Sequence, residues 1–229
     1  MTYLFQTPIE MPRGSHYGSD YWISYSYKLK RIIHLYSMLE YANFITLEMN
    51  PTVEYFCEQP LKIQDVNYSS NKRVSVFDFW VQYIDSTNEF QEIKYSSDLT
   101  GNNDSSIRAQ KQIEFQRDWC LTHRHNYRVI TEKDLYKGQF RIQNLELLHS
   151  HLLRYSQISR SPSENLYKLL SERILSIGEM QSLKILPKNY ELNILAYQYY
   201  LGNIEMNLND RPLDNYTEVK LCVEKNIIF

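Results

Sequence analysis

Residues 73–95 read RVSVFDFWVQYIDSTNEFQEIKY, and this stretch decides the fold. Its first part, residues 73–83, places alternate side chains on two faces with the two-residue period of a β-strand. The polar residues 85–88 are typical of a tight turn, and residues 89–95 resume the strand pattern. The stretch therefore predicts a β-hairpin.

Asp78 stands inside Val-Phe-Asp-Phe-Trp, where both faces of the expected strand are apolar. A lone carboxylate buried there costs several kcal/mol unless it is paired or binds a cation. Glu92 and Lys94 follow on the returning strand, two residues apart and thus on one face. If the hairpin pairs in even register about its turn, Asp78 lies on that face too. Two carboxylates and an ammonium then converge on one point.

Such a group suits the hydrolysis of a phosphodiester. Carboxylates hold the hard Mg²⁺ ion, with Mn²⁺ as a substitute, and the metal polarises the phosphate and lowers the pKa of the attacking water. Lys94 can orient that water or neutralise the charge that develops on the phosphate. Glu40, which precedes the hairpin in the sequence, can supply a third carboxylate.

The elements around the hairpin predict an α/β layer. An irregular arm is expected over residues 1–26, because proline, glycine and polar residues are frequent there. Helix, three strands, helix and strand then follow in that order. The expected ranges are a helix at 37–49, extended pieces at 53–57 and 61–63, the hairpin, a helix at about 106–123 and a strand at 127–131.

The strand signals become weaker after residue 141. Helical patterns occupy about 142–156, 164–177 and 190–201, and residues 204–208 and 217–223 are expected to form a hairpin. Residues 159–163 are the best candidate linker, which predicts one domain over 1–158 and a second over 159–229. Helices followed by a small hairpin favour a winged-helix-like domain, although helical repeats are an alternative.

The composition limits the possible functions. The 229 residues carry a formal net charge of −2, and residues 151–229 hold nine basic and nine acidic groups, so nucleic-acid contact requires a local patch or a partner. The sequence shows neither a membrane-spanning run nor a signal peptide. Three cysteines without a C-x-x-C fit a reducing cytosol, and the six glycines form no phosphate-binding loop.

Asp followed about a dozen residues later by Glu-x-Lys is the PD-(D/E)XK nuclease signature, and several longer segments resemble the TnsA family. TnsA is the endonuclease subunit of heteromeric transposases. The resemblance spans about residues 28–135. It is carried by Lys30–Glu40, Val53–Pro60, Phe77–Phe79, Gln91–Lys94 and Tyr127–Glu132. Phe77 stands where the family often has proline, and Glu92 where its best-known members have glutamine.

The resemblance implies a restriction-endonuclease-like αβββαβ core with a mixed sheet and a helical, winged-helix-like C-terminal domain. It implies that Glu40, Asp78, Glu92 and Lys94 form the catalytic set, with Mg²⁺ held by the three carboxylates. The expected substrate is double-stranded DNA at transposon ends, cleaved in cut-and-paste transposition. The implied partners are a TnsB-like DDE transposase subunit and a TnsC-like AAA+ ATPase regulator bound by the C-terminal domain. The expected location is the bacterial cytoplasm, at the nucleoid during the reaction.

Each site residue also has a plain structural interpretation. Ser37-x-x-Glu40 is a capping box. Asp78 can be a structural acid paired with Arg73 or Lys94, and Glu92 and Lys94 can be an ordinary surface pair. Five basic residues are either phosphate contacts or simply solvated: Lys28, Lys30, Arg31, Arg108 and Lys111. Two other functions stay open, a stand-alone restriction or repair nuclease of the same fold and a catalytically idle transposition scaffold.

Overall fold

The computed structural model describes residues 3–11, 20–65, 73–155 and 164–222. The chain divides into two compact units. Unit 1 comprises residues 1–44 and 52–135, and unit 2 comprises residues 45–51 and 136–229.

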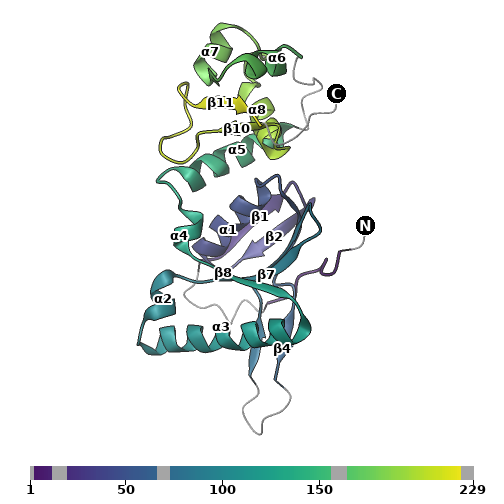
Figure 1. Cartoon of the computed structure of the whole chain (residues 1–229), viewed down its shortest axis with the longest axis vertical. Helices are drawn as coiled ribbons and strands as arrows, with labels where there is room; N and C mark the ends of the chain where they lie inside the picture. Colours follow the sequence, from purple (N-terminus) through teal and green to yellow (C-terminus); the bar gives the residue numbers. More distant parts are fainter. Residues whose placement is uncertain (1–2, 12–19, 66–72, 156–163, 223–229) are drawn as a thin grey trace. The chain divides into compact units, whose positions relative to one another are not determined.

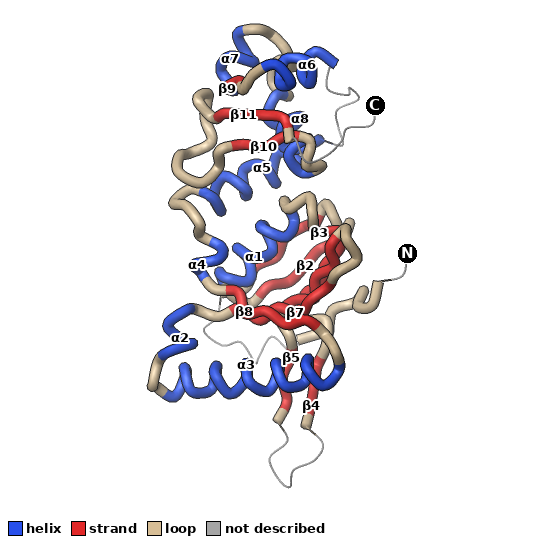
Figure 2. The backbone as a smooth tube through the Cα atoms, viewed as in Figure 1, coloured by secondary structure: helices blue, strands red, loops and turns tan. Residues whose placement is uncertain are grey.

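A four-stranded mixed sheet forms the centre of unit 1 (Figure 1). Its strands, in spatial order, are β3 (Val53–Glu58), β6 (Phe79–Tyr83), β7 (Asn88–Ile93) and β8 (Asn126–Ile130). The first three run antiparallel, and β8 lies parallel to β7. Helices α1 (Met38–Glu48) and α3 (Asp104–His123) lie on opposite sides of this sheet (Figure 2). The α/β architecture predicted from the sequence is confirmed.

Aromatic side chains fill both faces of the sheet. On the α1 side, Phe56 lies between Phe44 and Phe79, with ring centroids 6.1 and 6.3 Å away. On the α3 side, Phe77 stacks on Phe90 at 4.3 Å within a second cluster. These fully buried rings exclude water from the sheet, and fully burying each one stabilises the fold by about 1.5–3 kcal/mol. The sheet is thus a rigid base for the side chains at its edge.

Strands β6 and β7 form the predicted hairpin. Its register pairs Phe79 with Gln91 and Gln82 with Asn88. In the turn, Asp85 Oδ1 accepts hydrogen bonds from the backbone N–H and the hydroxyl of Thr87 at 2.9 and 2.6 Å. This short-range side-chain bond explains why the polar turn could be predicted.

The strand expected over residues 73–83 is in fact two strands. β5 (Val74–Val76) pairs with β4 (Lys62–Gln64) in a separate two-stranded sheet, and β6 begins only at Phe79. Asp78 lies in the interruption, where its carbonyl accepts a hydrogen bond from the N–H of Gln59 at 2.9 Å. The prediction of one continuous strand is therefore wrong, because the chain passes from one sheet to another at residues 77–78.

The expectation of an irregular arm over residues 1–26 is also wrong in its last part. β1 (Trp22–Ser26) pairs antiparallel with β2 (Arg31–Leu35). Exposed and buried residues alternate in β2. The sequence pattern of β1 is hidden by the glycines and prolines that precede it. Two short helices were not expected either, α2 (Ser96–Thr100) and α4 (Glu132–Leu135).

Helix α3 has strong signals at both ends. The side chain of Asn103 accepts a hydrogen bond from the N–H of Ser106, and Arg124 adopts the left-handed conformation with φ 60° at the C-cap. Its 20 residues are largely polar. Among the described residues, no helix has both the length and the apolar character needed to cross a membrane.

From residue 136 on, the described part of unit 2 consists of four helices and three short strands. They are α5 (Arg141–Tyr155), α6 (Glu164–Glu172), β9 (Leu175–Ser176), α7 (Ile177–Ser182), α8 (Glu191–Tyr200), β10 (Ile204–Met206) and β11 (Glu218–Leu221). The strands form a sheet in the order β10-β11-β9, with the predicted antiparallel pairing of β10 and β11. The helix expected over 164–177 ends at Glu172, because Ser176 and Glu179 form a capping box that begins α7.

The boundary predicted between residues 158 and 159, with the linker at 159–163, lies outside the described residues. Apart from residues 45–51, unit 2 begins at Tyr136. The reason is α5, which packs against α8 and so belongs to the C-terminal unit. A buried cluster around Leu170, Ile194 and Val219 forms the core of that unit.

Gly138 provides a test of the packing in unit 2. A Cβ atom at this position would lie 2.4 Å from the backbone oxygen of Asn209 and 2.7 Å from its carbonyl carbon. Because backbone atoms cannot turn aside, we expect Gly138→Ala to destabilise the protein by about 1–3 kcal/mol, measured by urea unfolding. The exposed neighbour Lys137 is the control, and Lys137→Ala should change stability by less than about 0.5 kcal/mol. Equal stability of the two variants would contradict this packing.

Candidate active site

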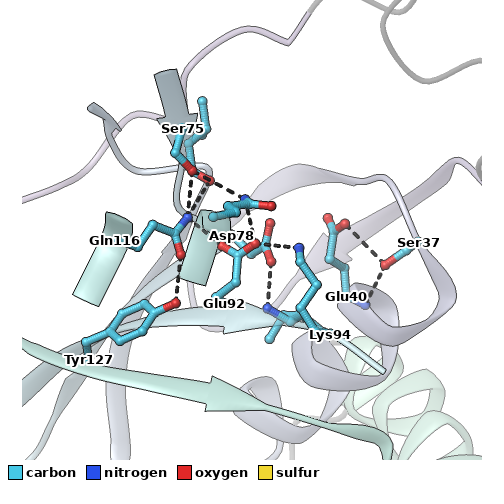
Figure 3. Close-up of polar contacts among 11 residues, drawn as sticks. Ser37, Glu40, Ser75, Asp78, Glu92, Lys94, Gln116 and Tyr127 are labelled. Atoms are coloured by element: carbon cyan, nitrogen blue, oxygen red, sulfur yellow. Dashed lines mark hydrogen bonds and ion pairs between the residues drawn. The ribbon is translucent and has the colours of Figure 1, made fainter. Parts of the chain in front are cut away.

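The candidate site is a cavity of about 520 Å³ in unit 1, at the end of the β6–β7 hairpin. The start of α1, the β5–β6 interruption, the end of β7 and helices α2 and α3 contribute its walls. Three of the four predicted catalytic residues line it, namely Glu40, Asp78 and Lys94. Figure 3 shows these side chains and their polar contacts.

Asp78 is placed by the interruption between β5 and β6. The hairpin register, continued by one residue beyond Phe79 and Gln91, sets Asp78 opposite Glu92, as the expected even register requires. Its Oδ2 accepts a hydrogen bond from the N–H of Ile93 at 2.6 Å. The carboxylate is therefore tied to β7 at the mouth of the cavity. Arg73, one of the two partners considered for Asp78, is an exposed residue.

Glu92 lies beneath the cavity and is fully buried. Lys94 Nζ approaches its Oε1 at 2.5 Å and forms an ion pair that is about one-fifth exposed on the lysine side. The pair is thus not the exposed surface pair that was one interpretation of the sequence. Burial, and next the charge of Asp78, raise the pKa of Glu92 to about 8.

Two glutamines of α3 donate further hydrogen bonds to the Glu92 carboxylate. Gln112 Nε2 donates to Oε1 at 2.7 Å, and Gln116 Nε2 donates to Oε2 at 2.8 Å. Sequence reasoning missed both residues, together with Ser75 and Tyr127, which bind the same amides. The sequence does place Gln112 and Gln116 four residues apart, on one face of the predicted helix. This spacing gains meaning only once their buried partner is known.

Glu40 combines the two roles that the sequence left open. Its N–H donates to Ser37 Oγ at 3.1 Å, and its carboxylate accepts hydrogen bonds from the Ser37 hydroxyl and the Tyr36 N–H at 3.2 and 3.0 Å. The bond from the Glu40 N–H to Ser37 is one half of a capping box, whereas the carboxylate binds the N–H of Tyr36, one residue before the N-cap. The same carboxylate faces the cavity and is 92% buried, since its relative exposure is 8%. Burial, followed by the charge of Asp78, raises the pKa of Glu40 to about 7.

The site holds more negative than positive charge. Burial by itself lowers the pKa of Lys94, but Asp78 and Glu92 outweigh it and the net shift is upward. One ammonium thus faces three carboxylates, and the raised pKa values of Glu40 and Glu92 share two causes, first burial and then the negative charge of Asp78. A bound cation would relieve this crowding.

The donor set fits a hard divalent cation by its chemistry. All three carboxylates offer oxygen, as Mg²⁺ and Mn²⁺ prefer. Among the described residues, no three carboxylate, imidazole or thiol groups come close enough to form a ready-made metal cluster. Glu40 and Asp78 line the cavity, and the buried Glu92 is joined to it through Lys94.

The five basic residues considered for DNA contact differ in their surroundings. Lys28 Nζ donates to the Val53 carbonyl at 2.6 Å, Lys30 Nζ lies 3.2 Å from the centroid of the Tyr27 ring, and Arg31 pairs with the buried Glu58 at 2.5 Å. These three are thus engaged within the protein. Arg108 and Lys111, by contrast, are exposed on α3.

One comparison with known proteins finds a match in the N-terminal part of the chain. Residues 50–132 match the family model described as "TnsA-like endonuclease N terminal". The matched segment contains the complete β6–β7 hairpin with Asp78, Glu92 and Lys94, whereas Glu40 precedes it. No curated protein matches the chain. Residues 50–132 therefore belong to the TnsA-like endonuclease family, of the PD-(D/E)XK type.

Proposed function

We propose that the protein is a metal-dependent DNA endonuclease subunit of a transposase complex, which cleaves DNA strands at transposon ends. The observation that carries this proposal is the placement of Asp78, Glu92 and Lys94 on one hairpin beside a cavity, within the matched segment. The exposed Arg108 and Lys111 on α3 are the best candidates for DNA phosphate contacts.

In the proposed reaction, the phosphodiester enters the cavity between Asp78 and Lys94. Mg²⁺, when bound, supplies polarisation of the phosphate and a water of lowered pKa. Glu40, Asp78 and Glu92 would hold the cation through their carboxylate oxygens. Lys94 keeps its proton, because the neighbouring carboxylates raise its pKa, and so offers a positive charge to a phosphate oxygen.

Unit 2 is proposed to be a winged-helix-like module that binds a protein. The order α6-β9-α7-α8-β10-β11 and its three-stranded sheet support the winged-helix assignment. In such modules the second helix of the pair reads DNA, but α8 carries no lysine or arginine and none of its ten residues is exposed. We therefore propose that unit 2 contacts an AAA+ ATPase regulator, while unit 1 acts beside a DDE transposase subunit.

Substitutions at the hairpin test the catalytic assignment. Asp78→Ala and Lys94→Ala should each reduce strand cleavage by at least about a thousandfold in a reconstituted transposition reaction, because each removes a charge from the reacting centre. Glu92→Gln should be the mildest change, since glutamine stands at this position in the best-known members of the family that the sequence resembles. Circular dichroism is the control for folding. Full transposition with Asp78→Ala would instead identify an idle scaffold.

Metal dependence is the second test. Cleavage should stop when the divalent cations are removed with EDTA and return with Mg²⁺ or Mn²⁺, whereas Ca²⁺ should bind without supporting turnover. The reason is the all-oxygen donor set of Glu40, Asp78 and Glu92. Cleavage by the metal-free protein contradicts the mechanism. Efficient cleavage by the metal-loaded chain alone would favour a stand-alone nuclease.

The binding role of unit 2 is tested on its exposed apolar residues. Leu183 and Tyr216 are 53% and 72% exposed and both line a cavity of about 570 Å³. In the full-length protein, Leu183→Glu and Tyr216→Ala should each weaken binding of the candidate ATPase regulator by about tenfold or more, measured by calorimetry. Leu121, 78% exposed on α3, is the matched control, and Leu121→Glu should leave regulator binding unchanged. Loss of duplex DNA binding, with regulator binding intact, would oppose this assignment.

A further inference from the structure

The two glutamines of α3, Gln112 and Gln116, both donate hydrogen bonds to the Glu92 carboxylate. They lie four residues apart, one helical turn, and each donates to a different oxygen of the same buried group. The Lys94 ammonium donates to Oε1. Among the described residues, the donor to Oε2 is the neutral amide of Gln116.

The orientation of the Gln116 amide is determined by its surroundings. The Tyr127 hydroxyl donates to Gln116 Oε1 at 2.8 Å, so the NH₂ group faces the other way. There Nε2 lies within reach of Glu92 Oε2 at 2.8 Å and Ser75 Oγ at 2.9 Å. Because Gln116 is fully buried, no water competes for these bonds. The line from Tyr127 through Gln116 to Glu92 thus holds one carboxylate oxygen in place.

Gln112 occupies the rim of the same arrangement. It lines the cavity, is only partly buried, and donates to the oxygen that Lys94 also binds. Both donors to Oε1, Lys94 and Gln112, line the cavity. The donor to Oε2, Gln116, is fully buried. Both donors on α3 are uncharged, and so they orient the carboxylate without cancelling its negative charge.

We propose that Gln112 and Gln116 are positioning residues that fix the Glu92 carboxylate for a divalent cation in the cavity. This inference rests on the proposed function and adds residues from a different element to it. Groups that hydrogen-bond a metal ligand set its orientation, and their loss typically weakens metal binding by about 10- to 100-fold. A lysine at either position would neutralise the ligand, whereas an amide leaves its charge available.

The test is direct Mn²⁺ binding by the full-length protein in calorimetry, without DNA. Gln112→Met and Gln116→Met keep the length of the side chain and remove the donor, and each should raise the Mn²⁺ dissociation constant about 10- to 100-fold. Tyr127→Phe, which removes only the group that orients the Gln116 amide, should weaken binding less. The melting temperature of every variant is measured beside the affinity.

Gln110 is the matched control on the same helix. Its Nε2 donates to the carbonyls of Gly101 and Asp98, at 2.9 and 3.4 Å, so Gln110→Met removes structural bonds but no contact with Glu92. Its Mn²⁺ affinity should equal that of the wild type even where its melting temperature falls. If affinity followed melting temperature across all the variants, the glutamines would be structural only.

The failures of the two proposals are distinguishable. Binding that disappears in Asp78→Ala but is unchanged in both methionine variants overturns the positioning role and leaves the metal site intact. A wild-type protein that does not bind Mn²⁺ overturns the metal site and the positioning role together. If Gln116→Met does not fold, the partly buried Gln112 decides the question alone, because its replacement opens no interior cavity.

Discussion

The burial of Glu92 is the constraint on which the site depends. A fully buried carboxylate costs several kcal/mol unless its charge is paired and its oxygens are hydrogen-bonded. Here the pairing comes from Lys94, two residues further along the chain, and the remaining bonds come from two amides of α3. The hairpin and the long helix must therefore meet at this position. The four-residue spacing of the two glutamines places both amides on the face of α3 that meets the hairpin.

The interruption at Asp78 is a second departure from regular structure at the same place. A continuous strand would have kept its ladder bonds, but residues 77–78 instead bond to Leu61 and Gln59. Gln59 itself has a positive φ of 38°, which is unfavourable for a residue with a side chain. Such local costs concentrate where a fold must direct a particular group. In this fold they turn the Asp78 carboxylate toward the N–H of Ile93 and the cavity.

The sequence allowed prediction of the elements whose signals are local. The β6–β7 hairpin, helices α1 and α3 and the β10–β11 hairpin follow from periodicity, caps and turn residues within a few positions. The β1–β2 hairpin, the split at residue 78 and the capping box at Ser176 required knowledge of partners distant in the chain or were masked by competing patterns. Asp78, Glu92 and Lys94 could be found by their spacing and apolar surroundings, whereas the resemblance to the family was needed to place Glu40 with them. The glutamines could not be identified, because nothing in the sequence shows which amides are hydrogen-bonded to a buried charged group.

Helix α5 links the boundary of the units to the role proposed for unit 2. Its packing against α8 moves the start of that unit to residue 136 and covers the helix that a DNA-reading module would present. Four consecutive residues of α8, Asn193–Ala196, are buried, and the side-chain amide of Asn193 donates to the carbonyl of His151 on α5. Uncovering α8 would expose this apolar stretch and leave that buried amide without its partner, both of which are costly. Any partner of unit 2 must accordingly bind a different face, and the exposed Leu183 and Tyr216 favour a protein over a phosphate backbone there.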